Sequence, residues 1–365
     1  MFKNSKDQNP DYILLLLPFL VFSIGLFFLH SASMNEGVAL DHSLVAKQVF
    51  WMCIAVSLTM IALRFHYRIL YDMAWPFYFF VLGALILVLF MPARLGARRW
   101  IDLGLFNFQP SELAKMSVLI AMAAVMSKRN FGKYHRRDFL LPFIVCLFPL
   151  ILVLKEPDLG TTLLFIPALF SMLFVAGFRV RWMMGILTFV IVTSPFLYAN
   201  LKGYQKQRIL TFLNPDSDPL GAGYTIIQSK IAIGSGGLLG KGLFAGSQTQ
   251  LRFLPERHTD FIFSVIAEEG GFIAAGLVIA IYGFIVWRGF TIANRCSNRF
   301  GKLLATGISS LIAFQALVNI SMTMGLIPVV GMPLFFISYG GSSAIVTLLL
   351  ISILVNIGMQ RDPFL

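Results

Sequence analysis

The chain has 365 residues, of which 58% are hydrophobic and 13% are charged, and its mean hydropathy is +0.80. A soluble globular domain is excluded, because such domains carry about 25% charged residues. The formal net charge is +12, but the lysines and arginines are spread through short connections and form no basic face for nucleic acid. The three cysteines show no disulfide or zinc pattern. Composition therefore predicts a protein of the lipid bilayer.

Long apolar runs, continuous rather than alternating, indicate membrane helices and not barrel strands. The first run is followed by Ser31-Ala32-Ser33, which resembles a signal-peptidase site. Its apolar core is longer than the roughly 7–15 residues of a signal peptide, so we expect a retained span. Ten spans are predicted in all, near 13–30, 44–63, 74–92, 111–126, 139–154, 160–177, 182–200, 262–287, 303–325 and 341–358.

Lysine and arginine assign the sides of the membrane. In the short connections they concentrate at the two termini and in the even-numbered connections, so both termini are predicted to be cytoplasmic. The seventh connection, 201–261, is then one large extracytoplasmic loop, which includes an amphipathic stretch, 224–233, suited to the membrane interface. We expect residues 1–365 to form a single all-α polytopic membrane domain of about ten transmembrane helices, with this loop between spans seven and eight.

Within that loop, residues 234–242 read Gly-Ser-Gly-Gly-Leu-Leu-Gly-Lys-Gly and superficially resemble a phosphate-binding loop. A Walker A motif needs glycine where Ser235 stands and serine or threonine where Gly242 stands. The stretch is therefore interpreted as a tightly turning loop and not as a nucleotide site.

One outward-facing connection carries arginines against the general trend. Arg94, Arg98 and Arg99 follow the third span and precede Trp100 and Asp102. Arginine matches phosphate oxygens in bidentate geometry. The two open interpretations are a specifically bound anionic lipid headgroup and simple anchoring to anionic lipid.

The fourth span opens with a pair of opposite charges. Pro110 suits the first helical position, and Glu112 suits the positive end of the helix dipole, so capping alone could explain Glu112. Lys115 lies one turn deeper on the same face. Ionisable residues inside a span mark functional sites, and we favour that interpretation of the pair.

Two further acidic stretches open later spans. Asp158 is placed as the N-cap of the sixth span. Residues 253–263, Phe-Leu-Pro-Glu-Arg-His-Thr-Asp-Phe-Ile-Phe, gather four titratable groups before the eighth span, and Thr259 or Asp260 as N-cap would account for only one of them. Glu268 and Glu269 follow about 12 Å along that helix and are rotated away from Asp260, so we expect them to pair elsewhere.

A carboxylate at the boundary of water and membrane, beside a histidine and an arginine, has the tunable pKa and the access that a general base needs. The surrounding cations suit a different task, which is to hold an anionic leaving group. Together they indicate group transfer from a polyprenyl-pyrophosphate carrier outside the cytoplasm.

Six motifs follow one another over nearly the whole chain: ARRWIDLG at 97–104, QPSE at 109–112, EPDLGT at 156–161, DPLGAGY at 218–224, LPERHTDFIF at 254–263 and PLFFISYGGS at 333–342. They resemble the shape, elongation, division and sporulation (SEDS) family. Arg257 and residues 228–237 resemble its elongation branch more than its division branch. The resemblance implies a peptidoglycan glycosyltransferase of the cytoplasmic (inner) membrane. Such an enzyme polymerises lipid II and works with a class B penicillin-binding protein and other elongation-complex proteins.

The resemblance also implies roles for single residues. Asp260 matches the family's essential aspartate and would accept the proton of the attacking sugar 4-hydroxyl. An α-linked pyrophosphate that gives a β-linked polymer means inversion, without a covalent intermediate. A divalent cation, magnesium or manganese, would fit this chemistry, but the sequence does not locate its ligands. The pyrophosphate is assigned to Arg98, Arg99, Lys115 and Arg208, and the supporting residues are Glu112, Asp158, Glu256, Arg257 and His258.

Two alternatives stay open. A flippase that moves lipid II across the membrane is compatible with many spans and with ionisable residues such as Lys115, Glu268 and Glu269. It would need polar groups along a two-sided path, whereas most of the motif residues lie at one face. A scaffold that only recruits the crosslinking enzyme explains the spans but not the outward-facing cations.

Overall fold

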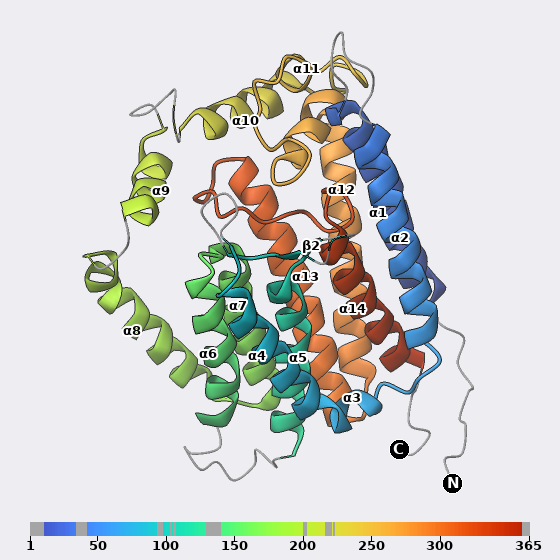
Figure 1. Cartoon of the computed structure of the whole chain (residues 1–365), viewed down its shortest axis with the longest axis vertical. Helices are drawn as coiled ribbons and strands as arrows, with labels where there is room; N and C mark the ends of the chain where they lie inside the picture. Colours follow the sequence, from blue (N-terminus) through green and yellow to red (C-terminus); the bar gives the residue numbers. More distant parts are fainter. Residues whose placement is uncertain are drawn as a thin grey trace.

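The computed structural model describes residues 11–33, 42–92, 98–102, 104, 107–128, 140–199, 203–215, 221 and 223–359, and it is a helical bundle (Figure 1). Ten helices coincide with the ten predicted spans. They are α1 (Tyr12–Ser33), α2 (His42–Ala62), α4 (Ala74–Val88), α5 (Pro110–Ser127), α6 (Leu140–Lys155), α7 (Leu159–Ala176), α8 (Val180–Ala199), α12 (Ile262–Arg295), α13 (Arg299–Thr323) and α14 (Gly341–Met359).

Seven of these ten helices are long and apolar enough to cross a membrane, by length and composition, among the residues that the structure describes. The other three, α4, α6 and the part of α8 over Val180–Ser194, are shorter apolar helices. The all-α polytopic fold is therefore confirmed, while the exact number of spans stays a prediction.

The remaining elements are short. A one-turn helix α3 (Ile69–Asp72) precedes α4, and an antiparallel pair of two-residue strands, β1 (Ile101–Asp102) and β2 (Asn107–Phe108), precedes α5. Between α8 and α12, the described residues form the helices α9 (Gly203–Leu213), α10 (Tyr224–Ser235) and α11 (Ser247–Gln250).

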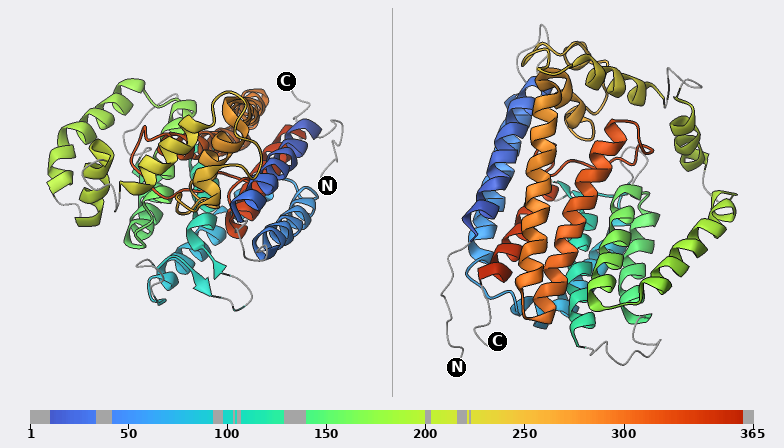
Figure 2. Two further views of the ribbon diagram at one scale, coloured as in Figure 1. Left: turned by 90° about the horizontal axis from the view of Figure 1, so that it is seen from above. Right: turned by 180° about the vertical axis from the view of Figure 1, so that it is seen from behind.

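The centre of the bundle is α13, which packs against α12, α7 and α5, while α14 packs against α2 and α4 against α5. Helices α8 and α9 lie on the opposite side of the bundle from α1 and α2 (Figure 2). Helix α10 packs against α12 and α11 contacts α1, so both lie over one end of the bundle (Figure 1). At the other end, Arg288 near the end of α12 pairs with Asp11, which precedes α1, at 2.5 Å.

Local sequence explains where α5 and α7 begin. Pro110 opens α5, as predicted, after Gln109 in an extended conformation. Asp158 is the N-cap of α7, as predicted, and its carboxylate accepts a hydrogen bond from the amide of Thr161 at 3.2 Å. Thr259 and Asp260 were possible caps of the eighth span, but Phe261 holds the N-cap position of α12 and makes no side-chain cap bond.

Helix α12 is broken at Gly271, whose φ of 68° and ψ of −168° suit glycine only. The glycine-rich loop 236–242 replaces the helical hydrogen bonds that the break removes. Lys241 and Gly242 donate their amides to the carbonyls of Glu268 and Glu269, both at 3.0 Å, and Phe272 donates to Gly237 at 2.9 Å. A Cβ on Gly240 would lie 2.1 Å from a backbone oxygen of α12. The loop is thus a backbone clamp on α12, which gives the tight turn expected from sequence a structural purpose.

The amphipathic stretch predicted at 224–233 is the helix α10. Its buried residues Ile226, Ser229 and Ala232 lie on one face, and Ser229 Oγ donates to the carbonyl of Thr323 in α13 at 2.6 Å. Its apolar face therefore packs on the protein.

Candidate active site

The first part of the site is a buried ion pair in the opening turns of α5. Lys115 is 1% exposed and Glu112 is 4% exposed, and the Lys115 ammonium lies 2.8 Å from the Glu112 carboxylate. The ammonium also donates to Gln315 Oε1 of α13 at 3.2 Å and lies over the ring of Phe335. The two residues paired from sequence are therefore brought together.

Two side-chain amides of α13 connect this ion pair with the segment around Asp260. Gln315 Nε2 donates to the carbonyl of Pro333 at 2.9 Å. One turn further, Asn319 Nδ2 donates to the carbonyls of Met332 at 2.6 Å and Asp260 at 3.0 Å. Sequence reasoning missed both amides, although two amides four residues apart in an apolar span were a signal of buried polar contacts.

The segment 331–340, between α13 and α14, holds the backbone before α12. Ser338 Oγ donates to the carbonyl of Thr259 at 2.6 Å, and the Tyr339 amide donates to the carbonyl of His258 at 2.9 Å. The motif PLFFISYGGS was part of the family resemblance, but the sequence assigned it no role. In the structure it fixes the backbone that carries Asp260.

The Asp260 side chain is half-buried and accepts no hydrogen bond from the residues that the structure describes. The pKa of this carboxyl is raised from 3.8 to about 6, and burial is the largest cause. Within that net shift, Glu256 and Asp158 also raise the pKa, while Arg99 and Arg208 lower it. A carboxylate with a free acceptor and a pKa near neutrality has the properties of a general base.

Asp158 joins the start of α7 to the start of α5. Besides capping α7, its carboxylate accepts hydrogen bonds from Ser111 Oγ at 3.1 Å and Gln109 Nε2 at 3.3 Å. Glu156, two residues before it, is fully buried, and neither of its carboxylate oxygens has a hydrogen-bond partner among the residues that the structure describes. Burial, with a smaller contribution from Asp158, raises the Glu156 pKa to about 9 against the opposing charge of Arg99, so this side chain is neutral at pH 7.

The predicted pyrophosphate cations are not all in one place. Arg99 donates to the carbonyls of Glu156 and Pro157, and it acts electrostatically on Asp260, as does Arg208 of α9. Arg208 also donates to the carbonyl of Val329 at 3.2 Å. Arg98 is exposed and donates to the carbonyl of Leu89 at 2.8 Å. Arg94 lies outside the described residues.

The three residues before Thr259 have different surroundings. Glu256 is exposed, has a positive φ of 49°, and accepts from Thr259 Oγ1 at 3.1 Å. Arg257 is buried and donates to the carbonyls of Ala32 and Thr249, both at 2.6 Å. Burial lowers the pKa values of Arg257 and His258. Arg257 is thus engaged by backbone carbonyls, which indicates a structural role.

A divalent cation is not supported by these residues. No group of three or more histidine, cysteine, aspartate or glutamate side chains in the described parts of the chain could hold a metal ion.

The fold and the site define a polytopic membrane protein whose buried charges gather where α5, α7 and α12 begin. The chain belongs to the FtsW/RodA/SpoVE family of cell cycle proteins, whose family model matches residues 11–362. It is similar to the peptidoglycan glycosyltransferase MrdB of Escherichia coli K12, with 38% identity over 97% of this chain and 94% of that protein. It is equally similar, at 38% identity, to a probable peptidoglycan glycosyltransferase FtsW of Geobacter metallireducens, covering 97% of this chain and 96% of the relative.

Two solved structures share the fold. One, described as the structural coordination of polymerization and crosslinking by a peptidoglycan synthase complex, has a TM-score of 0.82 and 33% identity, covering 97% of this chain and 99% of that chain. The other is the rod shape determining protein RodA of Thermus thermophilus, with a TM-score of 0.73 and 29% identity, covering 97% of this chain and 98% of that chain.

Proposed function

We propose that this chain is a peptidoglycan glycosyltransferase of the elongation type, which polymerises lipid II into glycan strands on the outer face of the cytoplasmic membrane. The names of its relatives support the activity. The observation that carries the assignment is the Asp260 carboxylate, which is half-buried, accepts no hydrogen bond from described residues and has a pKa raised to about 6.

The chemistry follows from that carboxylate. Asp260 accepts the proton of the acceptor 4-hydroxyl as its oxygen attacks the anomeric carbon of the donor glycan. The bond from that carbon to undecaprenyl pyrophosphate breaks, and the pyrophosphate leaves as an anion. One carboxylate is sufficient, because direct displacement inverts the anomeric centre and needs no protein nucleophile.

The cations take the leaving group. Arg99 and Arg208 are the cations that act on Asp260, so they are the first candidates for the pyrophosphate oxygens. Lys115 is already paired with Glu112 and Gln315. We therefore propose that its positive charge stabilises the pyrophosphate from a position behind the two arginines. Arg98 is exposed and lies at the edge of this set. Asp158 and Glu112 hold the first turns of α7 and α5 in place.

Topology and partners complete the proposal. Both termini lie in the cytoplasm, and the region 201–261 lies outside with the site. A class B penicillin-binding protein is the expected partner, supported by the similarity to a complex that coordinates polymerization and crosslinking. Lipid II, the nascent strand and other elongation-complex proteins are the remaining expected partners.

The flippase alternative receives less support. Buried charged side chains in the described residues lie near the ends of helices that face the large loop, and they are Glu112, Lys115, Glu156, Asp158, Arg257, Glu268 and Glu269. A path through the membrane needs polar groups on both sides. In liposomes with fluorescent lipid II on one leaflet, we expect no accelerated exchange between leaflets.

The deciding experiment supplies the purified chain with lipid II in detergent, with no other glycosyltransferase present. We expect glycan strands on a denaturing gel, made with or without a penicillin-binding protein whose transpeptidase serine is replaced. If the chain with that partner makes no polymer, while lipid II exchanges between leaflets, the enzyme assignment is wrong.

A further inference from the structure

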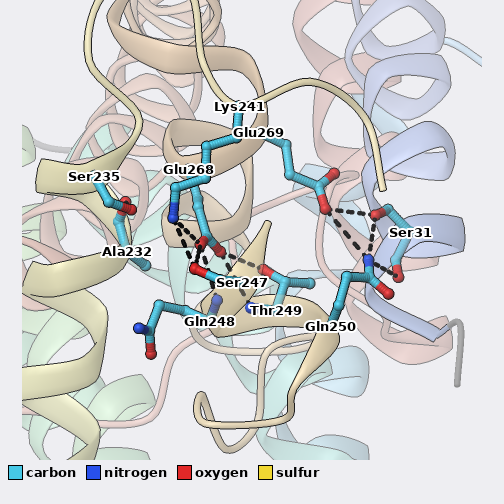
Figure 3. Close-up of polar contacts among 10 residues, drawn as sticks. All are labelled: Ser31, Ala232, Ser235, Lys241, Ser247, Gln248, Thr249, Gln250, Glu268 and Glu269. Carbon is cyan, nitrogen blue, oxygen red and sulfur yellow. Dashed lines mark hydrogen bonds and ion pairs between the residues drawn. The ribbon is translucent and has the colours of Figure 1, made fainter. Parts of the chain in front are cut away.

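A second carboxylate, Glu268, is completely occupied by the loop that precedes the site. It lies in α12 just before the break at Gly271 and is fully buried. Its Oε1 accepts from Lys241 Nζ at 2.8 Å, from the Gln248 amide at 2.9 Å and from Ser247 Oγ at 3.3 Å. Its Oε2 accepts from the amide and the hydroxyl of Thr249, at 3.1 and 2.9 Å (Figure 3).

These contacts fix the short helix α11 to α12. A carboxylate that accepts several hydrogen bonds is held in a fixed position, and here the donors come from three consecutive residues, Ser247 to Thr249, and one lysine. These contacts therefore also fix the position of the Thr249 carbonyl, which is the next group in the series that leads to Asp260.

Arg257 transmits that position to the site. Its Nη1 donates to the carbonyl of Thr249 at 2.6 Å, and its Nε donates to the carbonyl of Ala32 in the last turn of α1, also at 2.6 Å. Arg257 stands three residues before Asp260. The backbone from 257 to 260 is thus held from one side by Glu268, Thr249 and Arg257, and from the other side by Ser338, Tyr339 and Asn319.

The intervening backbone needs this support. Arg252 and Glu256 have positive φ angles of 59° and 49°, a conformation that costs on the order of 1 kcal/mol or more for residues other than glycine and persists only where the surroundings impose it. Without the contacts of Glu268 and Arg257 with Thr249, we expect the turn before Asp260 to relax to a less strained conformation.

We propose that Glu268 is a positioning residue for the transfer reaction, which sets the place of Asp260 through Thr249 and Arg257. The inference rests on the proposed function of Asp260 but concerns a different group, which touches no substrate. A reactive group displaced by about 1 Å costs about 100-fold in rate, so loosening this series of contacts lowers kcat rather than substrate binding.

The chain supplies a matched control in the next residue. Glu269 is also buried in α12, but it has fewer contacts: its Oε1 accepts from Ser31 Oγ at 2.6 Å and from Gln250 Nε2 at 3.5 Å, and the backbone of Phe244 also acts on the carboxylate. Glutamine at 269 keeps the Oε1 acceptor. Glutamine at 268 places an amide NH₂ against donors whichever way it turns, because both carboxylate oxygens are occupied.

The test compares Glu268→Gln, Glu269→Gln, Arg257→Gln and the double variant Glu268→Gln/Arg257→Gln in lipid II polymerisation. We expect kcat to fall about 10- to 100-fold in Glu268→Gln, with KM unchanged and with little effect of Glu269→Gln. The double variant should be no slower than the worse single variant, because both act through one series of contacts. Effects that multiply, or a normal kcat in Glu268→Gln, would overturn the proposal.

Hydrogen exchange supplies a readout that is independent of activity. Amides of residues 256–261 should exchange faster in Glu268→Gln than in the wild type and in Glu269→Gln. Equal exchange rates overturn the positioning role even if polymer is made. Faster exchange in Glu268→Gln, together with a wild-type chain that makes no polymer, preserves the mechanical coupling and refutes the glycosyltransferase assignment instead.

Discussion

The buried pair of Glu112 and Lys115 gives the prediction with the largest expected effect on stability. Lys115→Met removes the ammonium and leaves a carboxylate that is 4% exposed without the cation now 2.8 Å away. Removing one partner of a buried pair costs about 3–5 kcal/mol. A substitution of Lys115 alone is therefore expected to destabilise the fold as well as slow the reaction, which confounds its interpretation.

The double variant Glu112→Gln/Lys115→Met separates the two effects, because it leaves no uncompensated charge. We expect it to recover most of the stability lost by Lys115→Met, measured as the thermal unfolding midpoint in detergent. Its rate of lipid II polymerisation should stay low, since the positive field is gone. Lys128→Met, at the exposed end of the same helix, is the control and should cost within about 0.5 kcal/mol.

Two results would refute this reasoning. A Lys115→Met chain with wild-type stability would show that Glu112 carries no charge in the fold. A double variant with the wild-type polymerisation rate would show that Lys115 contributes nothing to catalysis.

Three further predictions follow from single groups. Polymerisation should decline as pH falls through about 6, because Asp260 is active only when deprotonated; a rate that is flat from pH 7 to 5 contradicts this. Glu156 is neutral in the fold up to about pH 9 but ionises near 4.5 when unfolded, so the folded state holds the extra proton. The free energy of unfolding should therefore fall by about 1.4 kcal/mol for each unit by which the pH rises between about 4.5 and 9. Glu156→Gln should remove this dependence, seen in midpoints at pH 5 and pH 8; an unchanged pH dependence contradicts the neutral carboxyl. Gly271→Ala should lower the midpoint, because φ is 68° and a Cβ would lie 2.2 Å from the Gly240 nitrogen. Gly276→Ala, where a Cβ meets nothing within 4 Å, should not; equal midpoints would contradict the clamp.

The helices could be predicted from sequence because burial in lipid demands long apolar runs, and each predicted window coincides with one helix. The pairing of Glu112 with Lys115 was also predictable, because i and i+3 share a helix face. Both are local properties of the chain.

The parts that could not be predicted depend on contacts between distant segments. The break at Gly271 lies inside a window that was predicted as one continuous span, and its replacement hydrogen bonds come from residues 237–242. Arg98 and Arg99 are consecutive, yet only Arg99 faces the carbonyls of Glu156 and Pro157. The N-cap of α12 is Phe261, although the polar residues Thr259 and Asp260 precede it, so local sequence alone did not identify the start of this helix.

The central claim is that Asp260 is the base of glycan polymerisation, and one comparison tests it most directly. Wild type and Asp260→Asn should be assayed for lipid II polymerisation at pH 7.5, with thermal midpoints measured on the same samples. A general base contributes about 100- to 10,000-fold, so the asparagine variant should lose at least about 100-fold in rate with an unchanged midpoint. Polymerisation by Asp260→Asn at the wild-type rate would contradict the account.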